Sequence, residues 1–395
     1  MSDEQHPDDM YPGDLLGFWK DLTPAQRAKL REVRRWLDEN VRPVIADHWE
    51  RAETLEFIRE PLTALRLLDD PELFDADGQL SRLYRGFLTL ELCRVDLAVS
   101  IVYGGQVGMF RTLVRAGGSP EQLAAWDDDI VSFRMTGCFA LNEPDHGSDV
   151  GGGMETTARR TADGWIINGR KRWIGNATIS DNIVVVAREE DGDRVLAFVV
   201  PSASTGLTRT VIERKAVARM VHNADIEFVD VFVPEERRLP RIESFADINR
   251  ALRPLRSDIA WSSAGMQLGA YEAALAYAQE RVQFGRPIAG FQMIQEKLVR
   301  IVANIAQTLA LASRCAAQPM TEDAPASLVK IVAADRLRET VALARETVGG
   351  NGVLLDYDVV RFFADAEAMF TFEGTREVNT LIVGRAITGR SAFTR

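Results

Sequence analysis

The sequence predicts an α+β protein in which a β-domain stands between two helical domains. Apolar residues recur at helical spacing before residue 134 and again after residue 246. Between these regions, short runs rich in Val and Ile alternate with Gly, Asn and Asp, which is typical of antiparallel strands joined by turns. We therefore expect an N-terminal α-helical domain over residues 1–134, a middle antiparallel β-domain over 135–245 and a C-terminal four-helix bundle over 246–395.

The composition is that of a globular protein with a large core. The chain has 395 residues, of which 46% are hydrophobic and 27% charged, and its formal net charge is −11. Lys and Arg are neither in excess nor clustered, so we expect no nucleic-acid partner. No run approaches the roughly 20 apolar residues that span a bilayer, so we expect no membrane insertion. The three cysteines are isolated and the four histidines form no ligand-like pair, so we expect no metal.

The two ends of the chain carry no recognisable address. Residues 1–10 are acidic and polar, and they lack the basic and apolar regions of a secretory signal. Residues 393–395 are not a peroxisomal tripeptide. A cytoplasmic location is the resulting expectation.

The helical pattern begins at Thr23, where Pro24 suits a first helical turn. The apolar run 97–110 is interrupted by three glycines, which suits either a buried helix or one that a ligand approaches closely. Strands are expected at 165–167, 183–187, 195–200 and 224–233, with turns at 163–164, 168–169 and 190–193. The expected C-terminal helices cover residues 260–278, 294–312, 326–348 and 375–388.

Five short segments combine glycines, aromatic residues and charges in a way that suits a cofactor site. They are 137–149 (GCFALNEPDHGSD), 171–176 (KRWIGN), 281–285 (RVQFG) with a Gln at 292, 346–352 (ETVGGNG) and 371–379 (TFEGTREVN). Each alone has an ordinary explanation: a turn after a strand, an aromatic strand residue, a helix-ending glycine, a helix-terminating loop and a first-turn charge. The glycines after Glu346 do not form G-x-G-x-x-G behind a strand, so no Rossmann domain is expected.

Taken together and in this order, the five segments resemble the acyl-CoA dehydrogenase family, whose fold has the same helix–sheet–helix order. The resemblance covers most of the chain, from about Leu90 to the C-terminus. It implies an FAD cofactor, an acyl-CoA substrate and α,β-desaturation of the thioester. It also implies an electron-transfer flavoprotein as electron acceptor and a homotetramer whose FAD sites are shared between subunits.

The segment 371–379 resembles the part of the family that carries the catalytic base. The matching carboxylate is Glu373, which would remove the α-proton while a hydride passes to flavin N5. Such a base needs a water-poor pocket that raises its pKa. Gly374 would lie at the substrate, and Thr375 and Asn379 at the flavin. Arg256 matches an arginine close to the base in relatives and is counted with the substrate-binding residues, although a surface arginine at a helix start is an equally ordinary explanation.

The remaining implied contacts come from the other four segments. Arg281 and Phe284 would reach the FAD of a neighbouring subunit, where the forked guanidinium suits the pyrophosphate. Ser148 would lie near both FAD and the CoA arm. The other residues implied to bind the cofactor are Phe139, Leu141, Asn142, Gly147, Trp173, Ile174, Gly175, Gln292, Glu346, Gly349 and Gly350.

Within the family, the local sequence most resembles glutaryl-CoA dehydrogenase and the plant peroxisomal short-chain acyl-CoA oxidases, and it departs from the glutaryl enzymes at Ser100. At this position, six residues beyond that of Arg94, the glutaryl enzymes have an arginine that binds the distal carboxylate of the substrate. Burying a carboxylate without a cation is costly, so we expect Ser100 to face an uncharged acyl chain.

Two further departures keep other functions open. Asn142 and Gly175 stand where many dehydrogenases have threonines at the flavin, and the oxidases share the Trp-Ile-Gly-Asn form. An acyl-CoA oxidase that reduces oxygen is therefore the alternative enzyme. A non-catalytic acyl-CoA-binding or scaffold protein is the alternative of another class, against which the intact Glu373 argues.

Overall fold

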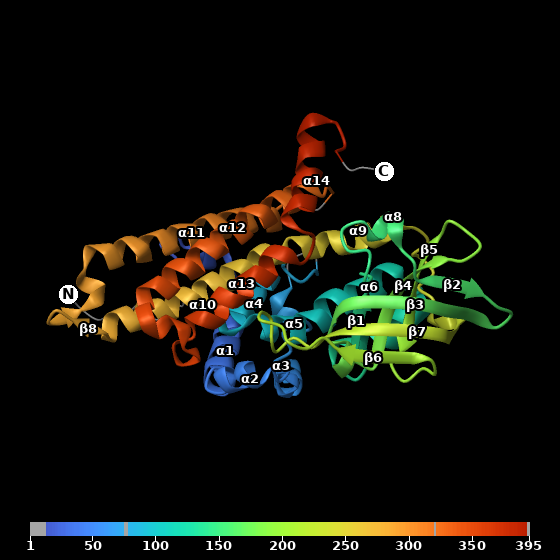
Figure 1. Ribbon diagram of the computed structural model, residues 1–395, viewed down its shortest axis with the longest axis horizontal. Coiled ribbons are helices and arrows are strands. Elements are labelled where there is room, and N and C mark those ends of the chain that lie inside the picture. Colours follow the sequence, from blue (N-terminus) through green and yellow to red (C-terminus); the bar gives the residue numbers. More distant parts are fainter. Residues whose placement is uncertain (1–12, 75–77, 320, 393–395) are drawn as a thin grey trace. The chain divides into compact units, whose positions relative to one another are not determined.

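The computed structural model describes residues 13–74, 78–319 and 321–392, and these fold into two compact units (Figure 1). The helical unit comprises Met1–Arg51, Arg66–Leu97 and Arg256–Arg395, and the sheet unit comprises Ala52–Leu65 and Ala98–Leu255. The acidic stretch 1–10 and the C-terminal tripeptide, on which the expected location depends, lie outside the described residues.

The first helices of the helical unit show both a local capping motif and close packing between helices. Helix α1 (Pro24–Asn40) begins with a capping box, in which the Thr23 hydroxyl accepts from the Gln26 N–H and the Gln26 side chain accepts from the Thr23 N–H. Helices α2 (Ile45–Arg51) and α4 (Arg82–Val95) follow in this unit. A Cβ on Gly86 of α4 would stand 2.2 Å from the Trp261 ring, so only glycine allows this close approach.

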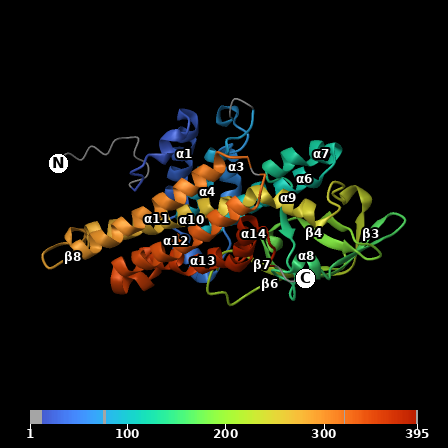
Figure 2. The same cartoon turned by 90° about the horizontal axis from the view of Figure 1, so that it is seen from above.

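Five C-terminal helices complete the helical unit (Figures 1 and 2). They are α10 (Asp258–Glu280), α11 (Gln292–Ala316), α12 (Ala324–Val348), α13 (Val359–Thr371) and α14 (Arg376–Thr388). The predicted C-terminal helical bundle is confirmed. Helix α13 was not among the predicted helices, although its buried residues Val359, Phe362, Ala366 and Met369 recur at helical spacing.

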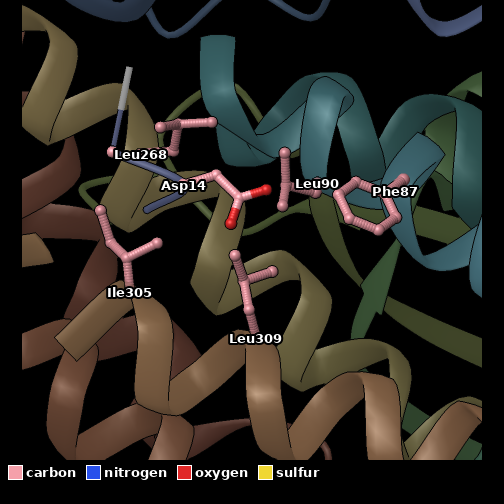
Figure 3. Close-up of a pocket in the computed structure, with 7 residues that line it drawn as sticks. Asp14, Phe87, Leu90, Leu268, Ile305 and Leu309 are labelled. Carbon is pink, nitrogen blue, oxygen red and sulfur yellow. The ribbon is translucent and has the colours of Figure 1, made fainter. Parts of the chain in front are cut away.

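A small internal cavity of about 10 Å³ lies in the helical unit, roughly the space of one water molecule. Figure 3 shows Asp14 among the apolar side chains that line it. The Asp14 carboxylate accepts from the N–H groups of Phe18 and Trp19, at 3.1 Å each. The cavity is far too small for a cofactor, and none of its lining residues belongs to the predicted site.

The sheet unit is built around a sheet in the order β1-β4-β2-β3-β7-β6, with β5 paired to β4. Its strands are β1 (Gly137–Ala140), β2 (Thr157–Arg160), β3 (Gly164–Gly175), β4 (Asn182–Glu189), β5 (Val195–Pro201), β6 (Leu207–Val211) and β7 (Asn223–Pro234). The shorter helices α3 (Arg59–Ala64), α7 (Pro120–Val131) and α8 (Val150–Gly153) also belong to this unit. Helix α9 (Phe245–Arg256) ends at the boundary between the units.

The predicted β-domain is confirmed, with two differences. Antiparallel pairing predominates, but β1 and β2 both run parallel to β4. Asn168 and Gly169 do not form the expected turn. They lie inside β3, where the register with β7 shifts between Ile167 and Gly169, so the strand continues through a bulge.

The apolar run 97–110 is helical and longer than expected. Helix α5 (Leu97–Gly104) continues through a π-helical turn (Gly105–Phe110) into α6 (Arg111–Gly117). By length and composition the stretch Leu97–Gly117 is sufficient to cross a membrane, which the sequence expectation overlooked. Half of its most apolar window is buried.

Candidate active site

Glu373 lies in a tight turn between two helices of the helical unit. Helix α13 ends at Thr371, and Phe372 is extended. Glu373 and Gly374 then both adopt left-handed backbone conformations, with φ of 58° and 83°. For a residue other than glycine this conformation costs on the order of 1–3 kcal/mol and persists only where neighbours hold it. The chain thus accepts local strain at the residue that the sequence nominated as the base.

Hydrogen bonds from three side chains hold this turn. The Thr375 hydroxyl caps α14 by accepting from the Val378 N–H at 3.3 Å. The Asn379 side-chain amide donates to the carbonyls of Gly374 and Thr375 at 2.8 and 3.0 Å. On the α13 side, the Lys330 ammonium donates to the Phe370 carbonyl at 2.8 Å. Asn379 is buried and its amide is engaged by the turn, and the flavin contact expected of it stays a prediction.

The electrostatic surroundings of Glu373 favour its neutral form. Burial raises the pKa of Glu373, and the nearby Asp258 raises it further. The cations Arg256 and Lys330 act in the opposite direction. Arg256 is not a detached surface residue, since its guanidinium lies 2.8 Å from the Asp323 carboxylate. The structure therefore brings Arg256 into the electrostatic environment of the predicted base.

A second group of predicted residues lies at the opposite end of α10. Helix α10 has 23 residues, about 34 Å at 1.5 Å per residue, with Arg256 just before its start and Arg281 just after its end. Arg281 leads into a short hairpin formed by Val282–Gln283 and Arg286–Pro287. Phe284, at the tip, has a φ of 51° and is 93% exposed. Gln292, the exposed first residue of α11, belongs to the same end.

Three further predicted residues lie at the C-terminal end of α12. Glu346 is in its last turn, where its carboxylate lies 3.0 Å from the Lys297 ammonium. Gly349 follows the helix with a φ of 68°. A Cβ on Gly349 or Gly350 would meet no atom within 4 Å, so the backbone here is open to an incoming group.

In the sheet unit, the predicted residues 139–148 follow the chain from β1 into a loop. Phe139 is in β1, while Leu141, Asn142, Gly147 and Ser148 lie in the loop before α8. All four of these loop residues are at least partly accessible, and a Cβ on Gly147 would meet nothing within 4 Å. The loop therefore presents backbone and the Ser148 side chain to solvent.

A buried ion pair, which the sequence reading missed, holds this loop. The Glu143 carboxylate accepts from the N–H groups of Glu155 and Thr156 at 2.6 and 3.0 Å, and from the Lys171 ammonium at 2.8 Å. Lys171 also donates to the Leu141 carbonyl at 2.9 Å. Glu143 and Lys171 each lie within one of the five sequence segments, but the local sequence does not indicate that they pair.

The end of β3 presents Trp173 outward. Its φ is 65°, it is 51% exposed, and the Arg172 guanidinium lies 5.1 Å from its ring centre. The neighbouring Ile174 has its side chain in the core of the sheet, so a cofactor would meet only its backbone. A Cβ on Gly175 would make ordinary van der Waals contacts with the side chains of Asn223, Val221 and Ile101 at 3.8–3.9 Å, so a small side chain would fit there.

Ser100 lies in the sheet unit, on α5, and is partly buried. Arg94, the cation six residues earlier, belongs to the helical unit and forms its ion pairs there. Arg94 is buried and contacts the carboxylates of Glu91, Glu272 and Asp38 at 3.0, 3.0 and 2.8 Å. Its guanidinium thus has its charge balanced within the helical unit.

Taken within each unit, the described residues suit a bound flavin nucleotide. Trp173 offers an exposed aromatic face, and Phe284 and Arg281 offer an exposed ring and an exposed cation. Gly147, Gly349 and Gly350 leave room beside their backbones. These are the features that ring stacking, phosphate pairing and close backbone approach require.

Comparison with known proteins assigns all three parts of the chain. The acyl-CoA dehydrogenase N-terminal domain matches residues 23–134, the middle domain matches 138–231 and the C-terminal domain matches 245–388.

Individual relatives agree with this assignment. A solved structure of a glutaryl-CoA dehydrogenase from Mycobacterium smegmatis in complex with FADH2 is 29% identical, with a TM-score of 0.87 over 97% of this chain and 100% of that one. The bovine (Bos taurus) mitochondrial short-chain specific acyl-CoA dehydrogenase is 32% identical over 91% of this chain and 89% of its own. CarC, a subunit of the caffeyl-CoA reductase–Etf complex of Acetobacterium woodii, is 30% identical over 74% and 79%. The chain belongs to the acyl-CoA dehydrogenase family, whose members are oxidoreductases that bind FAD.

Proposed function

We propose that the protein desaturates an uncharged acyl-CoA thioester between its α and β carbons, with Glu373 as the base. The observation that carries this proposal is the Glu373 turn, in which a carboxylate with a raised pKa is held in a strained, hydrogen-bonded conformation. Glu373 takes the α-proton as the α C–H bond breaks. FAD, when bound, would supply the acceptor for the β-hydrogen and its electron pair, and a Cα=Cβ double bond replaces the two broken C–H bonds.

The raised pKa suits Glu373 to this task. The α-proton of a thioester is weakly acidic, and a carboxylate that is more basic than usual transfers it more readily. Arg256 and Lys330 oppose the rise and so favour the ionised form that a base requires. Glu373 also remains partly accessible, as a base that meets a substrate must be.

Two observations support an uncharged acyl chain. Ser100 brings no charge to α5, and Arg94 is committed to three carboxylates. One compared relative acts on glutaryl-CoA and another on short-chain acyl-CoA, so the family accommodates both kinds of substrate. A carboxylate at the far end of the chain would need a cation that these residues do not supply.

We propose an electron-transfer flavoprotein as the electron acceptor, since CarC is named as part of a complex with such a protein. One observation favours oxygen instead. Gly175 stands at the end of β3, where many dehydrogenases place a threonine, and the missing hydroxyl would alter access of oxygen to the flavin. Peroxide released under air during turnover identifies an oxidase, and its absence leaves the electron-transfer flavoprotein as acceptor.

A homotetramer is the assembly we propose. The hairpin end of α10 and α11 exposes Val282, Phe284, Met293 and Val299, at 54, 93, 79 and 67%. An apolar cluster of this kind is typical of a surface covered by a partner. A neighbouring subunit here would also place Arg281 and Phe284 against that subunit's FAD.

The deciding experiment is an anaerobic titration of the purified protein with acyl-CoAs of increasing chain length and with glutaryl-CoA. We expect an uncharged acyl-CoA to bleach the oxidised flavin and glutaryl-CoA to fail. Glu373→Gln, which keeps the size of the side chain, should retain FAD and lose at least about a hundredfold in rate. A yellow protein that no acyl-CoA bleaches contradicts the proposal, and a colourless one supports the non-catalytic alternative.

A further inference from the structure

Lys330, in the second turn of α12, is a buried cation that neither gives nor takes a proton or hydride in the proposed reaction. It is only 1% exposed, which is rare for lysine because burial of an ammonium is costly without compensating partners. Its position is therefore held by specific interactions. They are found on the segment that carries Glu373.

The first interaction is a hydrogen bond to the end of α13. Lys330 Nζ donates to the Phe370 carbonyl at 2.8 Å. This carbonyl is among the last four of α13, which have no partner inside the helix. A cation at a helix C-terminus satisfies such a carbonyl and interacts favourably with the helix dipole. Lys330 thus fixes the helix end three residues before Glu373.

The second interaction is electrostatic. Lys330 lies in the field of Glu373, of Glu377 in the first turn of α14, and of Asp335 on its own helix. Burial lowers the pKa of Lys330 to about 8, against the pull of these carboxylates. The ammonium is therefore charged below about pH 8.

Glu373 itself faces charged groups on three helices. They are Arg256 at the end of α9, Asp258 at the start of α10 and Lys330 on α12. Arg256 is shared with Asp323, and Asp258 opposes ionisation of the base. Lys330 is the cation among them that is also bonded to the segment carrying the base.

We propose that Lys330 is a positioning residue for Glu373, which anchors the end of α13 and keeps a positive charge beside the carboxylate. This inference rests on the proposed function of Glu373 as the base. Its two parts are separable, because the anchor depends on a hydrogen-bond donor and the electrostatic effect depends on a charge.

Three substitutions separate these parts. Lys330→Met removes both the donor and the charge, Lys330→Gln keeps a donor without the charge, and Lys330→Arg keeps both. The matched control is Arg338→Met on the same helix. Arg338 also pairs with α13, donating to Glu367 at 2.8 Å, but it is half-exposed and is not among the groups that act on Glu373.

The direct measurement is an infrared titration of the Glu373 carboxyl in the FAD-loaded protein without substrate, assigned by difference from Glu373→Gln. Removal of the charge should raise the pKa of Glu373 by about one unit in Lys330→Met and Lys330→Gln, the lower end of the effect of a nearby opposite charge. Arg338→Met should leave it unchanged, and Lys330→Arg should restore it.

The second measurement is the rate of flavin reduction by acyl-CoA as a function of pH. Its acid limb should move upward by the same amount, with a loss approaching tenfold at pH values below the new pKa. An unshifted Glu373 pKa in Lys330→Gln overturns the proposal, even if Lys330→Met fails to fold. A wild-type protein that no acyl-CoA bleaches contradicts the proposed function instead, while the infrared titration still tests the effect of Lys330 on Glu373.

Discussion

The side chain of Asn379 packs against Gly374, which is the residue directly after the predicted base. Asn379 Nδ2 donates to the Gly374 carbonyl at 2.8 Å and lies 3.0 Å from the point where a Cβ on Gly374 would stand. With a φ of 83°, Gly374 is also in a conformation that other residues rarely adopt. The turn therefore needs a glycine for two independent reasons.

Gly374→Ala should destabilise this turn. The left-handed backbone costs an alanine about 1–2 kcal/mol, and the methyl group crowds the Asn379 amide. We expect a lower melting temperature together with slower flavin reduction, because the same turn carries Glu373. Gly384→Ala in α14 is the matched control. Its Cβ meets nothing within 4 Å, and helical alanine is favoured over glycine by roughly 0.5–1 kcal/mol. Equal melting temperatures for the two variants would argue against a strained turn.

The stability of the protein should depend on the ionisation of Glu373. Because its folded pKa lies above 4.5, Glu373 contributes most favourably below about pH 4.5, and this contribution is lost as the pH rises through the raised value. Glu373→Gln removes that loss. The melting temperature of the variant should therefore exceed that of the wild type near pH 7 and approach it near pH 4. A difference that does not vary with pH would show that the carboxyl titrates normally.

Arg281→Ala should lower both FAD occupancy and the fraction of tetramer. Its exposed guanidinium would pair with the cofactor of a neighbouring subunit, so cofactor and assembly should be lost together. Arg281→Lys should retain an intermediate occupancy, since an ammonium keeps the charge without the fork. The control is Arg300→Ala on α11, an exposed arginine paired with Glu339 and Glu296. Flavin absorbance and light scattering measure both quantities, and full occupancy in Arg281→Ala would contradict the assignment.

Lys171→Met should unfold the loop that follows β1. Burial alone would raise the pKa of Glu143, but Lys171 lowers it, so the carboxylate is ionised inside the protein. Removal of one partner of such a pair costs roughly 3–5 kcal/mol, because the other charge stays buried. Chemical unfolding should show this loss, and FAD retention should fall with it. The double variant with Glu143→Gln should regain part of the stability, and a double variant as unstable as the single one would contradict a dominant charge effect.

Local sequence was sufficient for much of the fold and for nominating Glu373 as the base. The helical and β-regions were predicted from the spacing of apolar residues. A helix or strand that buries one face has apolar residues at the period of that element. Thr23 and Pro24 predicted the start of α1 for a similar reason, since the cap is made within one turn. Glu373 was nominated from a contiguous motif. Thr375 and Asn379 were in the same motif, and the hydrogen bonds that they make within the turn are local.

Contacts between distant segments needed the three-dimensional fold. Lys330 and Phe370, or Glu143 and Lys171, are paired by packing of separate elements, and a buried lysine looks like a solvated one in the sequence. The same limit explains Asn168 and Gly169, which have the composition of a turn but lie within β3, where the ladder with β7 outweighs their local preference. The parallel pairing of β1 and β2 with β4 likewise depends on which apolar faces meet in the core, which no single segment specifies.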